Sequence, residues 1–361
     1  MKSALASLLL PLGALALALL LFGACVALGG VSPLEFWWLL FKGAFGDAFS
    51  WQNTLQRAAP LILCGLCVAL PAQAGLVIIG GEGAMVLGGL ACAALPTLIS
   101  LPHNAVGTVM ICLVGALMGA AWITLAGALR QYRGINETIS SLLLSYVAIG
   151  IFKHLVEGPL RDPSSLNKPS SHTLADGLQM QGLWGSDVHA GLMVGVVLCM
   201  ILATLLYKTT WGFSIRTIGG NLRAAQLVGL PVHFWVLVSC ALGGACAGLA
   251  GAIEVAAIHT NANASLITGY GYAGILVAFI ARQQPLAIVP VAILFGGFGA
   301  AGSLLQRRLG LPDASVLVLQ GLAFVLILAS ESLRGKDWRA WRQKLFRLSA
   351  QPIASSTGAP S

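Results

Sequence analysis

Two glutamates stand in apolar surroundings, where a carboxylate is costly. Glu82 follows the run Leu-Val-Ile-Ile-Gly-Gly, and Glu254 follows Leu-Ala-Gly-Ala-Ile. A charged side chain near the middle of a membrane span costs about 2.5–3.5 kcal/mol on insertion scales, so it faces a cavity or a partner. Two roles are therefore open. Both carboxylates line a solute pathway, or both are structural, with Glu82 capping a helix that begins at Gly83 and Glu254 paired to a backbone or hydroxyl donor.

A second group of polar side chains includes residues on both sides of a glycine-containing break. We expect the following residues to line an external mouth: Arg57, His259, Asn261, Asn263 and Tyr270. Asparagine amides and aromatic rings suit a polar, ring-bearing solute, because they combine hydrogen bonds with flat apolar faces. Residues of these types also occur at membrane interfaces without any function. Both interpretations stay open at this point.

Two glycine-rich motifs are typical of nucleotide-binding sites. No Walker A sequence, G-x-x-x-x-G-K-[ST], occurs in the chain, so we expect neither ATP binding of that kind nor any other cofactor. Gly269, Gly271 and Gly274 form a G-x-G-x-x-G, but dinucleotide binding needs a strand and a soluble βαβ unit. We interpret these glycines as points of backbone freedom and close helix approach. Two further pairs have the same interpretation: Gly115/Gly119 and Gly244/Gly248.

The eight cysteines all lie in apolar segments, where they behave as small hydrophobic residues. Cys64 and Cys67 form a C-x-x-C, yet no second pair or nearby histidine accompanies it. We therefore expect neither a metal site nor a disulfide framework. An enzyme that acts on lipids would need a convergent acid, base or metal set, and the sequence suggests none.

The composition defines the class of protein. Hydrophobic residues make up 57% of the 361 positions and charged residues 9%, against about 25% charged residues in soluble domains. Charge-free stretches of about 20 residues are typical of transmembrane helices. We therefore predict an all-α, polytopic membrane protein without a soluble domain of ordinary size. The net charge of +8 fits the excess of Lys and Arg on cytoplasmic loops, so nucleic-acid binding is not expected.

About ten transmembrane segments are predicted from the charge-free stretches. They are 3–33, 58–81, two within 83–129, 139–156, 188–207, 232–258, 273–280, 286–305 and 315–333. Segment 32–53, with three tryptophans, and segment 158–187, with mixed charges, are predicted as external loops. Pro102-His103-Asn104 is predicted as a tight turn. The first segment is expected to be an uncleaved helix and not a lipoprotein signal that ends at Cys25.

The distribution of basic residues predicts the orientation in the membrane. With both termini on the cytoplasmic side, 13 of the 20 Lys and Arg residues lie inside, in agreement with the positive-inside rule. Arg307 and Arg308, in a predicted external turn, go against it. Residues 1–333 form the predicted transmembrane domain, and 334–361 form a basic cytoplasmic tail.

The order of the spans predicts an internal symmetry. Spans 2–5 and 7–10 would run in opposite senses, and each set begins with a long helix that enters a glycine-rich interruption. The interruptions lie near 71–83 and 260–272, with Glu82 and Glu254 close by. Inverted repeats with discontinuous helices are typical of transporters, because unwound backbone and half-helix ends offer hydrogen bonds to a solute.

A basic, polar stretch at 208–231 separates spans 6 and 7. It contains Arg216 and Arg223, an Asn221 able to cap a helix, and a short helical run at 222–228 that Gly229 closes. A short helix with its own start and stop signals suggests a docking surface on the cytoplasmic side. A solvated basic loop is the alternative.

Four motifs together resemble a known family. They are Gly75-Leu-Val-Ile-Ile-Gly-Gly-Glu-Gly, Gly134-Ile-Asn-Glu-Thr-Ile-Ser-Ser-Leu-Leu-Leu-Ser-Tyr, Trp211-Gly-Phe-Ser-Ile-Arg-Thr-Ile-Gly-Gly-Asn-Leu-Arg-Ala-Ala and Ala247-Gly-Leu-Ala-Gly-Ala-Ile-Glu-Val. In this order they resemble the permease subunits of bacterial ABC importers. The resemblance is to the ribose and branched-chain amino acid permease superfamily, most closely to its nucleoside and simple-sugar branch, and covers residues from about 54 to 333.

The resemblance implies a ten-span permease domain that pairs with a second permease subunit, identical or different, in the bacterial cytoplasmic (inner) membrane. A separate ABC ATPase subunit would bind the 208–231 loop and hydrolyse ATP, so this chain would not itself be an enzyme. An external solute-binding protein would deliver the solute. By position, the resemblance places the following residues in the ATPase-coupling loop: Gly212, Arg216, Gly219, Asn221, Ala224, Ala225 and Gly229. The chain departs from the family pattern at Thr217, Gly220 and Leu222.

The resemblance predicts ATP-driven import of nucleosides, or of related simple sugars, by alternating access coupled through the 208–231 loop. Two alternatives remain open. One is an ABC importer of sugars or branched-chain amino acids. The other is a proton-coupled secondary transporter, in which Glu82 or Glu254 would titrate during the cycle.

Overall fold

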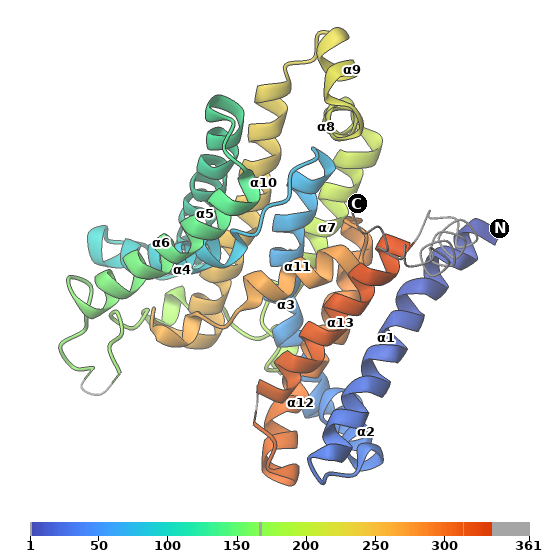
Figure 1. Cartoon of the computed structure of the whole chain (residues 1–361). Coiled ribbons are helices and arrows are strands. Elements are labelled where there is room, and N and C mark those ends of the chain that lie inside the picture. The colour runs from blue at the N-terminus through green and yellow to red at the C-terminus, as the bar shows by residue number, and fades with distance from the viewer. Residues whose placement is uncertain (1, 166–167, 313, 334–361) are drawn as a thin grey trace, which may run out of the picture.

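The chain is built from helices that lie side by side (Figure 1). The computed structural model describes residues 2–165, 168–312 and 314–333, so the predicted basic tail at 334–361 lies outside the described residues. The helices are α1 (Lys2–Leu28), α2 (Pro33–Phe41), α3 (Ala48–Gln73), α4 (Gly81–Leu98), α5 (Ala105–Arg133), α6 (Glu137–Glu157), α7 (Gly191–Lys208), α8 (Thr210–Gly220), α9 (Leu222–Leu227), α10 (Val232–Glu254), α11 (Tyr270–Ile280), α12 (Pro285–Leu309) and α13 (Ala314–Leu333).

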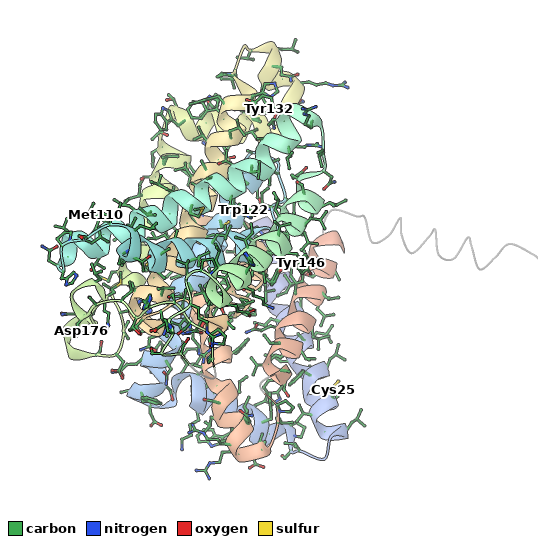
Figure 2. The ribbon with its side chains drawn as sticks, turned by 90° about the vertical axis from the view of Figure 1, so that its left-hand side faces the viewer. Cys25, Met110, Trp122, Tyr132, Tyr146 and Asp176 are labelled. Atoms are coloured by element: carbon green, nitrogen blue, oxygen red, sulfur yellow. The ribbon has the colours of Figure 1, made fainter. Side chains whose placement is uncertain are left out.

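The predicted all-α membrane architecture is confirmed. Among the described residues, seven helices are long and apolar enough to cross a membrane, and three shorter apolar helices lie at Gly13–Leu28, Ala264–Ile280 and Ala314–Ser330. Together they match the ten predicted segments. Exposed apolar side chains cover the flank formed by α5 and α6, where Met110 and Tyr146 point outward (Figure 2).

The segment predicted as an external loop at 32–53 is helical instead. Helix α2 begins at Pro33, and a π-helical turn at Lys42–Gly46 leads toward the start of α3 at Ala48. Proline suits a first helical position because its missing N–H would have no intrahelical partner there. Trp38 and Phe41 remain exposed, as expected of aromatic residues at a membrane interface.

Both predicted interruptions are present. Helix α3 ends at Gln73, and residues 74–80 are not helical before α4 begins at Gly81. In the second half, α10 continues into a π-helical turn at Val255–His259, and an irregular segment that includes the short turn Ala264–Leu266 precedes α11. Helix α11 starts at Tyr270, three residues before the predicted position, because Gly269 takes the left-handed conformation (φ 81°) that ends the irregular segment.

The two halves pack reciprocally. Helix α3 packs against α11 and α12, whereas α10 packs against α4 and α5, and α3 and α10 also contact each other. The end of α3 and the start of α10 both lie near α8 and α9, so the two long helices run in opposite directions (Figure 1). This arrangement agrees with the predicted inverted repeats.

Glycines form the seam between α4, α5 and α10. A Cβ atom added to Gly248 would lie 2.2 Å from the carbonyl oxygen of Gly115, and one added to Gly119 would lie 2.3 Å from that of Gly244. No side chain fits in these positions without moving a backbone. The prediction that these glycine pairs mediate close helix packing is confirmed.

Asparagine caps fix the boundaries of α5 and α6. The side chain of Asn104 accepts hydrogen bonds from the N–H groups of Val106 and Gly107, so the predicted tight turn is confirmed as the start of α5. Asn136 accepts from Thr138 and its neighbour Ile139 in the same way. Each cap satisfies N–H groups that have no partner within their own helix.

Arg307 and Arg308 were predicted to lie in an external turn. They lie instead in the last turn of α12. Gly310 ends this helix in the left-handed conformation, with φ 65°. Basic side chains are favourable at this position because the helix dipole places partial negative charge at the C-terminus. The remaining apolar helix, α1, packs along α13.

Candidate functional site

Glu82 joins the two interrupted helices. Its side chain is fully buried in the first turn of α4. One carboxylate oxygen accepts a hydrogen bond from the N–H of Gly269 at 2.8 Å, and the other accepts from Gly271 at 2.7 Å. Glu82 therefore caps the N-terminus of α11, where the helix dipole favours negative charge. It does not cap its own helix, which is the structural one of the two roles that the sequence leaves open.

The close approach of Gly271 makes this contact between helix ends possible. A Cβ atom on Gly271 would lie 2.1 Å from the backbone nitrogen of Glu82. Gly271 and Gly274 therefore serve close helix approach, whereas Gly269 supplies the left-handed backbone before α11, with φ 81°. Gly274 continues the same surface, since a Cβ atom there would lie 2.6 Å from the Cβ of Cys64 on α3.

Hydroxyl groups from one face of α6 hold the first interruption. Thr138 donates a hydrogen bond to the carbonyl oxygen of Val77 at 2.9 Å, and Ser141 accepts one from the N–H of Ile79 at 3.1 Å. Ser145, one turn further along α6, accepts from the N–H of Gly83 at 3.4 Å. We call Thr138, Ser141 and Ser145 the α6 hydroxyl row. These side chains replace hydrogen bonds that the interrupted helix cannot supply.

The loop between α6 and α7 holds the second interruption. Backbone N–H groups of Ser171 and Leu174 donate to the carbonyl oxygens of Ala262 and Thr260, at 2.9 and 2.7 Å. The Ser171 hydroxyl also accepts from the N–H of Ala262. Hydrogen bonds from Ser164 hold the pKa of Asp162, in the same loop, below its usual range. The predicted loop is therefore an ordered strap across the break.

The two asparagines of the predicted external mouth are bound to each other. The amide of Asn263 donates to the side-chain oxygen of Asn261 at 2.5 Å, and the oxygen of Asn263 accepts from the N–H of Ser265 at 2.8 Å. Asn263 thus caps the short turn Ala264–Leu266. Both asparagines shape the second interruption, and their contact with a solute stays a prediction.

Glu254 lies at the end of α10 and is buried. One of its carboxylate oxygens is 3.7 Å from Nε2 of His259, across the π-helical turn. Arg57 on α3 lies within electrostatic reach of both Glu254 and Tyr270. Four of the predicted site residues therefore converge where α3, α10 and α11 meet.

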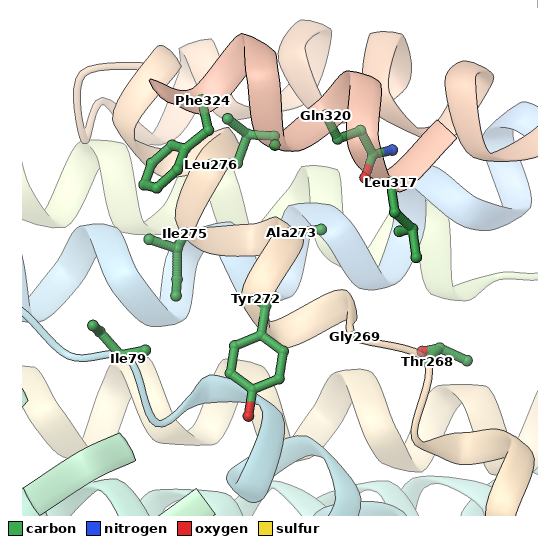
Figure 3. A pocket seen from close by; sticks show the side chains of 11 residues that line it. Ile79, Thr268, Gly269, Tyr272, Ala273, Ile275, Leu276, Leu317, Gln320 and Phe324 are labelled. Atoms are coloured by element: carbon green, nitrogen blue, oxygen red, sulfur yellow. The ribbon is translucent and has the colours of Figure 1, made fainter. Parts of the chain in front are cut away.

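A cavity of about 510 Å³ lies between α11 and α13; we call it the α11–α13 cavity. Figure 3 shows Tyr272 from α11, Gln320 and Phe324 from α13, and Ile79 from the first interruption around it. A smaller cavity of about 100 Å³ shares Thr268 and Gln320 with it, among other residues. Arg57 and Tyr270 line this smaller cavity, so two of the predicted residues border the same hollow region.

The α8–α9 end carries the predicted coupling loop. Thr209 caps α8 by accepting from the N–H of Gly212, and Asn221 caps α9 by accepting from Ala224 at 3.1 Å, as predicted for Asn221. Gly229 follows α9 in the left-handed conformation, with φ 79°. Helix α8 was not predicted from the sequence. Its buried face is defined by packing against α7 and α10, and the sequence does not show that these helices lie beside it.

Among the residues predicted to form the ATPase-coupling loop, some support the packing of α8 and α9 and others are exposed. Gly212 packs against the carbonyl of Leu206, and Ala225 is fully buried. The guanidinium carbon of Arg216 lies 5.3 Å from the ring centre of Tyr207, a cation–π geometry. Sequence reasoning missed the two most exposed apolar side chains here, Leu227 (89% exposed) and Val228 (78% exposed).

The two halves pack reciprocally, each half is interrupted beside a cavity, and capped surface helices lie at one end. Together these features define the membrane-spanning subunit of a transporter. The sequence profile of a family described as "Branched-chain amino acid transport system / permease component" matches residues 50–328. The chain belongs to this family of ABC transporter permeases, which are not themselves enzymes. The predicted resemblance is thereby confirmed.

Relatives of known name share most of the chain. A glucose ABC transporter permease protein of Haloferax volcanii is 32% identical, over 85% of this chain and 85% of its own length. A guanosine ABC transporter permease protein of Bacillus subtilis is 26% identical, over 92% of this chain and 97% of its own. A nucleoside ABC transporter permease protein of Lactococcus lactis subsp. cremoris is 27% identical, over 80% and 81%.

Proposed function

We propose that this chain is the permease subunit of an ATP-driven importer of nucleosides, working by alternating access. The family supports the transporter class, and the guanosine and nucleoside permeases among the relatives support the solute. The α11–α13 cavity carries the solute proposal. Its volume of about 510 Å³ falls in the usual range for small-molecule sites, roughly 300–1,000 Å³.

The side chains of the cavity suit a nucleoside. Tyr272 and Phe324 offer aromatic faces for a base. Gln320 and Thr268 offer both donors and acceptors for base edges or ribose hydroxyls. A simple sugar is the second candidate, because the relative from Haloferax volcanii is a glucose permease. Aromatic and amide groups also bind sugars. A direct comparison of nucleoside and sugar uptake is therefore needed to identify the solute.

The partners follow from the two ends of the molecule. We assign the ATPase contact to the α8–α9 end, where Leu227 and Val228 form an exposed apolar tip next to the exposed Arg223. Exposed apolar patches rimmed by polar residues mark protein–protein contact sites, and arginine is enriched in interface hot spots. ATP is bound and hydrolysed by that partner, so this chain needs no cofactor. A second permease subunit and an external solute-binding protein complete the complex, in the bacterial cytoplasmic membrane with both termini inside.

Uptake into proteoliposomes tests this function. The chain is reconstituted with the permease, ATPase and solute-binding subunits encoded beside it, and uptake of radiolabelled guanosine and glucose is measured with ATP. We expect guanosine uptake that requires ATP hydrolysis and persists with a protonophore. Leu227→Asp plus Val228→Asp should lower it about tenfold or more. Leu28→Asp, at a position 90% exposed on α1, is the control.

The outcomes separate the alternatives. Uptake without ATP that a protonophore abolishes would show a proton-coupled secondary transporter and return attention to Glu82 and Glu254. Uptake of glucose in preference to guanosine would keep the importer and replace its solute. Equal loss in the docking variant and in Leu28→Asp would remove the assignment of the α8–α9 end to the ATPase.

A further inference from the structure

Helix α8 packs against α7 and α10 and also touches the end of α3. A Cβ atom on Gly219 would lie 2.1 Å from the carbonyl oxygen of Gln73, the last residue of α3, and 3.0 Å from the nitrogen of Gly75. Gly220, the next residue of α8, has no atom within 4 Å of its equivalent position. The contact is therefore specific to one side of the helix end.

Gln73 also reaches the far end of α11. Its side-chain amide donates a hydrogen bond to the carbonyl oxygen of Gln283 at 2.9 Å, across 210 positions of sequence. Gln283 and Arg282 form the turn after α11, and both take the left-handed conformation, with φ 58° and 54°. L-residues disfavour this conformation, so the turn depends on contacts from outside, and Gln73 supplies one.

The first turn of α11 is held by the segment that follows Gln73. Residues 74–80 lead from Gln73 to α4, and Glu82 in the first turn of α4 binds the N–H groups of Gly269 and Gly271. Both ends of the short helix α11 are thus tied to the stretch that begins at Gln73. Tyr272, Ala273 and Leu276 of that helix line the α11–α13 cavity.

We propose that Gln73 is the positioning residue through which α8 moves α11, so that a displacement at the ATPase contact reaches the cavity. This inference rests on the proposed function. When α8 shifts, Gly219 carries the carbonyl of Gln73 with it. The Gln73 amide then moves the Arg282–Gln283 turn, and residues 74–80 move Glu82. Helix α11 moves as one body, because both of its ends receive the displacement.

Matched pairs of variants in the reconstituted complex test whether Gln73 connects α8 to α11. Gly219→Ala places a methyl group against Gln73, and Gly220→Ala makes the same change in open space. Gln73→Met keeps the length of the side chain but removes its donor. Gln284→Met makes the same change at an exposed position in the same turn. Labelled guanosine uptake and phosphate release are measured in the same proteoliposomes, and the readout is solute moved per ATP hydrolysed.

We expect Gln73→Met and Gly219→Ala to lower this ratio about tenfold, within the range of typical coupling between distant sites, while Gly220→Ala and Gln284→Met keep the wild-type ratio. A purely structural role would reduce the amount of complex, and with it uptake and hydrolysis together, and would leave the ratio unchanged. An unchanged ratio in Gln73→Met therefore overturns the inference. Wild-type protein that takes up no guanosine with ATP fails at the earlier step, and shows that the proposed function is wrong.

Discussion

At the scale of single residues, Glu82 shows how a carboxylate is kept inside an apolar helical protein. Two backbone N–H groups at the start of α11 take the place of water, at 2.8 and 2.7 Å. Hydrogen bonds to an ionised acceptor are stronger than neutral ones, and the dipole of α11 adds to them. The geometry accounts for a buried glutamate without any need for it to bind solute or protons.

Replacing Glu82 therefore tests whether its role is structural. Glu82→Gln turns one acceptor oxygen into an NH₂ group that faces a backbone N–H, so one hydrogen bond is lost. Because hydrogen bonds to charged groups contribute about 1.5–3 kcal/mol, we expect the free energy of unfolding to fall by about 2 kcal/mol. Denaturant unfolding of the purified chain in detergent measures it. Glu35→Gln, exposed on α2, should change little. Wild-type stability combined with lost uptake would instead place Glu82 in the transport step.

At the scale of elements, the sequence predicted those helix positions and boundaries that depend on local signals. The ten apolar segments follow from charge-free runs, and the two interruptions follow from proline and glycine. The start of α5 follows from the tight turn at 102–104, and the start of α9 from the asparagine cap at Asn221. The helical character of 32–53 and the existence of α8 were missed. Both depend on packing: α8 buries Ile215 and Ile218 against neighbours that the sequence does not identify.

The candidate site was less predictable than the elements. Glu82 was singled out because charge is rare in apolar segments, but its partners lie far away in sequence. Glu82 binds residues 187 and 189 positions ahead, and no local pattern encodes such a pairing. The α6 hydroxyl row was visible as a Thr-x-x-Ser-x-x-x-Ser spacing within a quoted motif. Its meaning required the interrupted backbone beside it.

The α6 hydroxyl row provides a prediction about an element. Ser141→Ala removes the acceptor for the N–H of Ile79, so that a backbone group at the interruption loses its partner. An unsatisfied group of this kind costs about 1–3 kcal/mol. We expect a loss of that size in unfolding free energy and faster hydrogen exchange at residues 77–80. Ser140→Ala is the control, because the Ser140 hydroxyl bonds only to Glu137 within α6. Equal exchange in both variants would show that α6 does not hold the interruption.

At the scale of the whole molecule, stability depends on how closely the two halves approach. The glycine seam lets α10 lie directly against α5, with backbone atoms of Gly248 and Gly119 in contact. Such close approach increases dispersion contacts between helices, which are one of the forces that drive helix association within a membrane. The packing of α10 against α5 therefore rests on residues without side chains.

A methyl group in the seam should separate the halves. Gly248→Ala would bring a Cβ atom within 2.2 Å of the Gly115 oxygen, and overpacking of this kind costs about 1–3 kcal/mol. Gly150→Ala on α6, where the space is open, should be neutral or stabilising, since alanine favours helix by up to about 1 kcal/mol over glycine. The yield of folded protein in mild detergent and its melting temperature measure both. Equal values for the two variants would show that the seam tolerates side chains.

The contact between Glu82 and α11 also has a consequence for biogenesis. A ribosome adds about 5–20 residues per second, so the donors at Gly269 and Gly271 emerge roughly 10 to 40 s after Glu82, which lies 187 and 189 positions earlier. During that interval the nascent first half holds a carboxylate without its final ligands. A chain cut short before α11 would leave the Glu82 side chain without both of its backbone donors, and an unsatisfied buried polar group costs about 1–3 kcal/mol.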